Sequence, residues 1–252
     1  MYPAAPVVAD DYDVLDLEDV EMAFEMLGSG GVEVVGDGDE VDGVALELLD
    51  GLLDGAIEDE RCVALVLTGL PGMGKSRLLQ TLMHRVRRDR PEVTVLHDSG
   101  DPTRSNANYG SLASMFKDLA GVAAFDSPAE QRRKLEVRLE KHAPKTNSPV
   151  SWEPILDLCV PGPTAPETPP VHPPLEAAAQ AWFSAECHEH PVLLTLDDTH
   201  WIDASTLRCI DGLIRSATNL PMFVLNVQRD SSQQHTPLPW HGRAQELRLS
   251  GL

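Results

Sequence analysis

Residues 69–76 read G-L-P-G-M-G-K-S and follow directly on the apolar run of residues 62–67. Glycine has no Cβ, so the backbone N–H groups of such a loop can curl around an anion. Lys75 brings a compact positive charge to the β- and γ-phosphates, and the hydroxyl of Ser76 can ligate Mg²⁺. The pattern therefore predicts a phosphate-binding loop between a strand and a helix, which commits the chain to binding a nucleotide.

The residues expected to contact the nucleotide form one continuous segment. They are Gly69, Leu70, Pro71, Gly72, Met73, Gly74, Lys75, Ser76 and Arg77. Behind the loop, apolar residues recur at helical spacing, namely Leu78, Leu79, Leu82, Met83 and Val86. Asp89 and Pro91 end this predicted helix, whose N-terminus would add its partial positive charge to the phosphate site.

A second element of the site is expected where an apolar strand ends in acid, because Mg²⁺ needs a carboxylate opposite the loop hydroxyl. Residues 192–198 read V-L-L-T-L-D-D and supply it. We expect Asp197 to orient the metal through its water shell and Asp198 to polarise the water that attacks the γ-phosphate. The alternative is a buried strand whose acidic end only caps a helix beginning near Asp203.

Strand-like and helix-like segments alternate along the chain, which predicts an α/β fold with a parallel sheet. The expected strands are residues 62–67, 93–96, 192–196, 222–227 and 246–249, and the expected further helices are residues 46–57, 109–119, 128–142, 175–189 and 203–216. Ligands of such sheets bind at the carboxyl ends of the strands. Arg229 follows one strand end and is a candidate sensor of the γ-phosphate. Its alternative role is a surface ion pair.

Composition divides the chain unevenly. The 252 residues, 42% of them hydrophobic, can bury one sizeable α/β core. The formal charge is -20, but residues 1–60 hold 19 of the 40 acids and no Lys or Arg. We therefore expect an acidic leader over residues 1–31, partly disordered and with one amphipathic helix, followed by a P-loop core over residues 32–252. Ten of the twenty prolines fall in residues 144–174, a density that predicts an extended surface insert without regular helix.

Several classes of protein and site are disfavoured. The sequence has neither a long apolar span nor a secretory signal, so a cytoplasmic protein without membrane contact is expected. The near-neutral core offers no basic stripe for direct nucleic-acid binding. The four cysteines lack C-x-x-C spacing and need no disulfide or metal. Residues 187–190 read C-H-E-H, but ligands so close on a helix face different ways, which argues against zinc.

Three ordered motifs resemble a known family: G-L-P-G-M-G-K-S-R-L-L, L-D-D-T-H-W-I-D and F-V-L-N-V-Q-R-D. They are similar to the AAA-type ATPase module of the signal-transduction ATPases with numerous domains, as in LuxR-type large regulators and multidomain cyclases and kinases. The resemblance runs from about Val34 to Leu252. It implies a three-layer P-loop sandwich with a five-stranded sheet of order 5-1-4-3-2, and ATP with Mg²⁺ as ligands.

The resemblance also implies the role of each site residue. Lys75 and Ser76 would hold the phosphates and the metal, Asp197 the metal, Asp198 the attacking water, and Arg229 the sensing position. His200 and Trp201 match the second motif, and we expect them to pack the turn between strand and helix. Residues 35–40 lack the arginine with which family members contact the base. The helical lid and effector region of the family are expected to be absent from this chain.

The leading hypothesis is thus an ATP-binding, slowly hydrolysing regulatory core of a signalling or transcription-type switch, acting on a protein partner or a missing effector. An alternative is a non-hydrolysing nucleotide-binding scaffold that presents the acidic leader helix to a partner. A third hypothesis is a metabolic phosphotransferase with an acceptor site in residues 97–110, which would require an arginine-rich lid.

Overall fold

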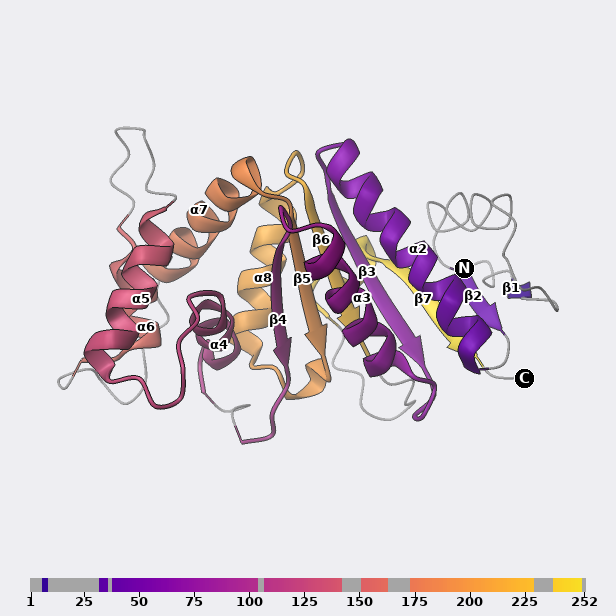
Figure 1. Cartoon of the computed structure of the whole chain (residues 1–252), viewed down its shortest axis with the longest axis horizontal. Helices are drawn as coiled ribbons and strands as arrows, with labels where there is room; N and C mark the ends of the chain where they lie inside the picture. Colours follow the sequence, from indigo (N-terminus) through magenta and orange to yellow (C-terminus); the bar gives the residue numbers. More distant parts are fainter. Residues whose placement is uncertain are drawn as a thin grey trace.

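The computed structural model describes residues 6–8, 32–35, 38–103, 107–141, 151–162, 173–228 and 238–250. They form a parallel β-sheet with helices on both faces, so the chain has an α/β fold (Figure 1). The strands are β1 (Pro6–Val8), β2 (Val32–Val35), β3 (Cys62–Gly69), β4 (Thr94–Ser99), β5 (Val192–Asp197), β6 (Met222–Val227) and β7 (Gln245–Ser250).

The helices lie in the segments between the strands. The α-helices are α2 (Gly38–Glu58), α3 (Lys75–Asp89), α4 (Gly110–Leu119), α5 (Pro128–Glu140), α6 (Glu153–Cys159), α7 (Pro173–Glu189) and α8 (Ala204–Ser216), and the 3-10 helices are η1 (Thr199–Trp201) and η2 (His241–Arg243). The helices predicted from hydrophobic spacing after residue 45 are confirmed, with ends displaced by at most two residues except at the start of α2, which lies eight residues before the predicted one. The amphipathic helix predicted within residues 1–31 lies outside the described residues.

The strand order is β1-β2-β7-β3-β6-β5-β4, and the paired strands run parallel. Numbered from β3 as the first strand, the inner part β7-β3-β6-β5-β4 has the predicted order 5-1-4-3-2, which is therefore confirmed. The sheet is wider than predicted, because β2 and β1 extend it beyond β7. Four residues are too few for β2 to be recognised from periodicity.

The three layers follow from the strand pattern. In β3, Val63, Leu65 and Leu67 point to the face covered by α2 and α3, whereas Ala64 and Val66 point to the opposite face, where α4, α7 and α8 pack. Figure 1 shows α2 and α3 in front of the sheet and α8 behind it. A strand covered on both faces is apolar along its whole length, which is why β3, β5 and β6 read as continuous apolar runs.

The prediction that residues 144–174 contain no regular helix is wrong. Helix α6 lies within this segment and buries Ile155, Leu156 and Cys159 in the core behind the sheet. Pro154 stands in the first turn of α6, where a missing N–H breaks no hydrogen bond. The prolines of this segment are therefore incompatible with the interior of a helix, but they are tolerated in its first turn. Residues 142–150 and 163–172 lie outside the described residues.

None of the described helices combines the length and the apolar character needed to cross a membrane. Cys62, Cys159, Cys187 and Cys209 are free thiols. Burial raises the pKa of Cys62 to about 11 and that of each of the other three to about 12, so all four are protonated at neutral pH.

Candidate nucleotide-binding site

The loop between β3 and α3 has the backbone that its glycines predict. Gly72 and Gly74 have φ angles of 89° and 76°, in the region that residues with a side chain rarely adopt. Gly69 needs glycine for a different reason, because a Cβ there would stand 2.7 Å from the carbonyl oxygen of Leu249 in β7. The loop thus curves tightly at the carboxyl end of β3 and opens directly into α3.

Lys75 is held inside this loop. Its Nζ donates hydrogen bonds to the carbonyl oxygens of Gly69 and Leu70, both at 2.7 Å, and only 7% of the residue is exposed. A buried ammonium group is stable only when it is hydrogen-bonded. The two carbonyls therefore keep the positive charge within the curve of the loop.

The acidic pair lies at the carboxyl end of β5. The backbone N–H of Asp198 donates to Oδ1 of Asp197 at 2.8 Å, and Asp198 itself has a left-handed backbone with a φ of 46°. The N–H of Gly100 donates to the carbonyl oxygen of Asp197 at 2.9 Å, which joins the end of β4 to this turn. The chain therefore bends sharply after β5, and the two successive carboxylates occupy different positions.

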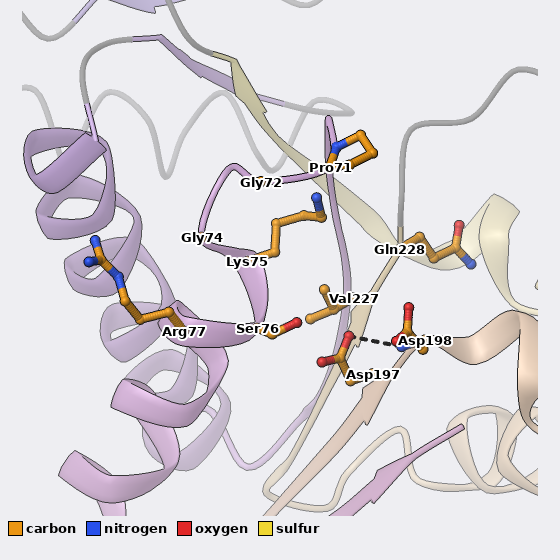
Figure 2. A pocket seen from close by; sticks show the side chains of 10 residues that line it. All are labelled: Pro71, Gly72, Gly74, Lys75, Ser76, Arg77, Asp197, Asp198, Val227 and Gln228. Atoms are coloured by element: carbon orange, nitrogen blue, oxygen red, sulfur yellow. Dashed lines mark hydrogen bonds between the residues drawn. The ribbon is translucent and has the colours of Figure 1, made fainter. Parts of the chain in front are cut away.

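The loop and the acidic pair face each other across one cleft of about 420 Å³. Figure 2 shows the Ser76 hydroxyl directed toward Asp197, with Lys75 and Asp198 on opposite sides of the cleft. The cleft lies at the carboxyl ends of β3, β5 and β6, where parallel sheets bind ligands. Its lining residues are Pro71, Gly72, Gly74, Lys75, Ser76, Arg77, Asp197, Asp198, Val227 and Gln228.

Most of the site residues predicted from the sequence are brought together there, and their chemical roles stay predictions. Gly69 and Leu70 take part through the carbonyls that hold Lys75, and the N–H of Met73 donates to the Leu70 carbonyl at 3.3 Å within the loop turn. Arg77 extends away from Lys75 and Ser76, at the rim of the cleft (Figure 2). Arg229 lies outside the described residues.

Two further residues lie at the site that the sequence did not predict. Gln228 follows β6, lines the cleft and donates from Nε2 to Thr199 Oγ1 at 3.4 Å. Its position directly after a predicted strand was a usable signal, as it was for Asp197. Asp42 of α2 lies beside Gly74, and its Oδ2 accepts a 3.0 Å hydrogen bond from Arg77 Nε. Nothing in the sequence around Asp42 indicated this contact.

His97 of β4 lies close to the acidic pair on the α3 side of the sheet. Its Nδ1 is 2.9 Å from Thr195 Oγ1. Burial lowers the pKa of His97 below the ordinary 6.5, and the nearby charge of Asp197 opposes part of this shift. His97 is thus uncharged at neutral pH.

The residues present fit a nucleotide with Mg²⁺. The glycine loop offers N–H groups without Cβ atoms in the way, and Lys75 offers a charge for phosphate. Ser76 and Asp197 offer oxygen donors, the type of ligand that Mg²⁺ prefers. In the described part of the chain there is no group of three or more His, Cys, Asp or Glu side chains that could hold a metal by themselves.

A family model described as "AAA ATPase domain" matches residues 44–225, a span that contains the phosphate loop and the acidic pair. No curated protein matches the chain. Among solved structures, one titled "Structure of Rhizobiales Trip13" is similar, with 16% sequence identity and a TM-score of 0.37. The match covers 94% of this chain and 67% of that one.

Proposed function

The chain belongs to the AAA ATPase domain family, and from that membership we propose that it binds ATP with Mg²⁺ in the cleft between the glycine loop and the acidic pair, and hydrolyses it slowly. We further propose that it serves as the regulatory core of a signalling or transcription-type switch, acting on a protein partner or an effector region. The observation that carries the proposal is the placement of Lys75 and Ser76 opposite Asp197 and Asp198.

The chemistry of the cleft supports triphosphate binding. Backbone N–H groups and the N-terminus of α3 attract the anionic phosphates. Lys75 would exchange its two carbonyl acceptors for phosphate oxygens, which are the stronger partners because they are charged. Ser76 and Asp197 would hold Mg²⁺, which when bound neutralises charge on the β- and γ-phosphates.

The hydrolytic step rests on Asp198. The left-handed backbone after β5 separates its carboxylate from that of Asp197, so that one acid can serve the metal while the other orients a water. Asp198 would accept a hydrogen bond from that water and hold it for attack on the γ-phosphorus. Arg229, which follows Gln228 in the sequence, stays the proposed group that stabilises charge on the transferred phosphate.

Ligand-induced stabilisation tests nucleotide binding. ATP, ADP and GTP are added in turn to the protein with Mg²⁺, and the melting temperature is measured. A ligand that binds only the native state at a hundred times its dissociation constant should add about 2.7 kcal/mol of stability. Lys75→Ala should abolish the shift. If no nucleotide raises the melting temperature of the unmodified chain, the proposed function is wrong.

Steady-state phosphate release tests hydrolysis separately. Asp198→Asn should retain ATP binding and lose turnover, because the amide cannot act as a base. If the unmodified chain binds ATP but releases no more phosphate than Asp198→Asn does, the ATPase proposal gives way to a non-hydrolysing scaffold. ATP consumption that increases on adding small alcohols or nucleosides, without a matching release of free phosphate, would instead favour a phosphotransferase.

A further inference from the structure

Ion pairs connect α2 to α3 along the length of the two helices. Acidic residues of α2 meet arginines that belong to α3 or directly follow it: Asp42 with Arg77, Glu47 and Asp50 with Arg85, and Asp54 with Arg90. The Glu47–Arg85 and Asp50–Arg85 distances are 2.9 Å, and the Asp54–Arg90 distance is 2.7 Å. The charges therefore hold α2 against the helix that begins at the phosphate loop.

The pair between Asp42 and Arg77 differs from the others in its position. The Oδ1 and Oδ2 atoms of Asp42 lie 3.2 and 3.4 Å from where a Cβ on Gly74 would stand, and Gly74 lines the cleft. The Asp42 side chain is only 17% exposed. Asp54 is twelve residues further along α2, which corresponds to about 18 Å of helix. Only the first of these pairs thus lies beside the phosphate loop.

A carboxylate in this place opposes the binding of phosphates. Like charges repel with an energy that grows as the local dielectric falls, and Asp42 is shielded from water by the protein around it. Arg77 places its guanidinium against that carboxylate, with Nε at 3.0 Å from Oδ2, and it also lines the rim of the cleft. Carboxylate and phosphate are both preferred partners of arginine. The guanidinium therefore neutralises the carboxylate that stands beside the loop.

We propose that Asp42 and Arg77 form a charge switch that sets the nucleotide affinity of the site, with the exposed side chain of Arg77 as the moving part. While the guanidinium of Arg77 is hydrogen-bonded to Asp42, the two charges compensate each other beside the loop. Opening the pair leaves the negative charge of Asp42 uncompensated beside the loop, so affinity falls. This inference rests on the proposed nucleotide binding and adds a means of regulation to it.

A double-mutant cycle on affinity for MgATP tests the switch by calorimetric titration. Arg77→Gln leaves the Asp42 charge uncompensated and should weaken binding about tenfold, a change of about 1.4 kcal/mol. Asp42→Asn should tighten binding about threefold, and the double variant should return to within about twofold of the unmodified chain.

Two controls separate charge from simple support of the loop. Asp54→Asn breaks a pair of the same kind further along α2 and should leave affinity unchanged. Adenosine lacks phosphates, so its affinity should be the same for all variants. Because the Debye length falls from about 10 Å at 0.1 M salt to about 3 Å at 1 M, high salt should shrink the effect of Arg77→Gln.

The outcomes distinguish this inference from the function on which it rests. Failure of the unmodified chain to bind MgATP would overturn both. If the chain binds MgATP and Asp42→Asn does not restore the affinity lost in Arg77→Gln, only the charge switch is wrong. Equal losses of affinity in Arg77→Gln and Asp54→Asn would also overturn it, since they would indicate loss of helix packing. Melting temperatures without nucleotide establish that each variant is folded.

Discussion

The backbone N–H of Tyr109 donates a 2.8 Å hydrogen bond to Oδ1 of Asp203, a residue 94 positions further along the chain. The same carboxylate accepts hydrogen bonds from the N–H of Ser111 at 3.2 Å and from the N–H and hydroxyl of Thr206, both at 2.8 Å. One buried side chain therefore caps α8 and ties the start of α4 to it. The Asp203 cap lies six residues after Asp197, at the start of the helix that follows the acidic pair.

Asp203→Ala should lower the free energy of unfolding by about 3 kcal/mol or more, because it leaves several buried donors without an acceptor. Denaturant titration measures the change. Ser127→Ala is the matched control, since Ser127 caps α5 at an exposed site, where its Oγ accepts one hydrogen bond from the N–H of Glu130, and its loss should cost about 1 kcal/mol. Equal losses in the two variants would contradict the supporting role of Asp203.

Gly100→Ala should reduce ATP hydrolysis more than ATP binding. A Cβ on Gly100 would clash with the carbonyl oxygen of Asp198 and stand 2.9 Å from the Cβ of Trp201, so the turn that carries Asp198 must shift. A displacement of this kind should lower kcat by about tenfold or more, while the loop that binds phosphate is untouched. Gly162→Ala is the control, because no described residue lies within 4 Å of the added Cβ. Unchanged phosphate release in Gly100→Ala would show that hydrolysis does not depend on the position of the turn that carries Asp198.

Two glycine-to-alanine substitutions should change the free energy of unfolding in opposite directions. Gly43 lies within α2 with open space around it, so Gly43→Ala should raise the free energy of unfolding by about 0.5 to 1 kcal/mol. Gly69→Ala should lower it by about 1 to 3 kcal/mol, because its Cβ would meet the Leu249 carbonyl of the neighbouring strand. Thermal or denaturant unfolding of both variants measures the difference. A stabilised Gly69→Ala protein would show that β3 and β7 do not pack as closely as described.

His97 should make stability depend on pH. The unfolded chain protonates this histidine near pH 6.5, whereas burial lowers its pKa in the folded chain. Between these two values the unfolded state binds more protons, so the stabilising contribution is fully present above pH 6.5 and is lost as the pH falls toward the folded value. Replacing the imidazole in His97→Gln should remove this part of the pH dependence. Urea titrations at pH 7 and pH 5 measure the free energy of unfolding at each pH. An equal change in this free energy between the two pH values in both proteins would contradict the expectation.

Local sequence was sufficient where a residue's role depends on its close neighbours. The spacing of residues 69–76 predicted a glycine loop, and the positive φ angles of Gly72 and Gly74 agree with it. Long apolar runs predicted β3, β5 and β6, because strands buried on both faces cannot carry polar residues at every second position. The sheet order came from the family resemblance rather than from any local pattern, and the strand pairing confirms it.

Local sequence was insufficient where distant segments meet. Strand β2 is four residues long and is defined by its pairing with β7, in which Glu33 lies opposite Arg248. Helix α6 was not predicted, because the proline in its first turn was interpreted as excluding a helix. Asp42 could not be connected with the phosphate loop, because 35 residues separate it from Arg77. The γ-phosphate role of Arg229 stays a prediction, since that residue lies outside the described part of the chain.

By itself, then, the amino-acid sequence determined that a phosphate loop opens a helix after a buried strand, and that a second buried strand ends in two acids. Those features depend on backbone freedom and hydrophobic burial, which act over a few residues. Only the tertiary structure decided that Asp42 stands against Gly74, that Asp203 joins α4 to α8, and that the loop and the acids share one cleft. These relations arise from the parallel pairing and twist of strands far apart in the chain, and from charges on α2 and α3 that meet only when the two helices pack side by side.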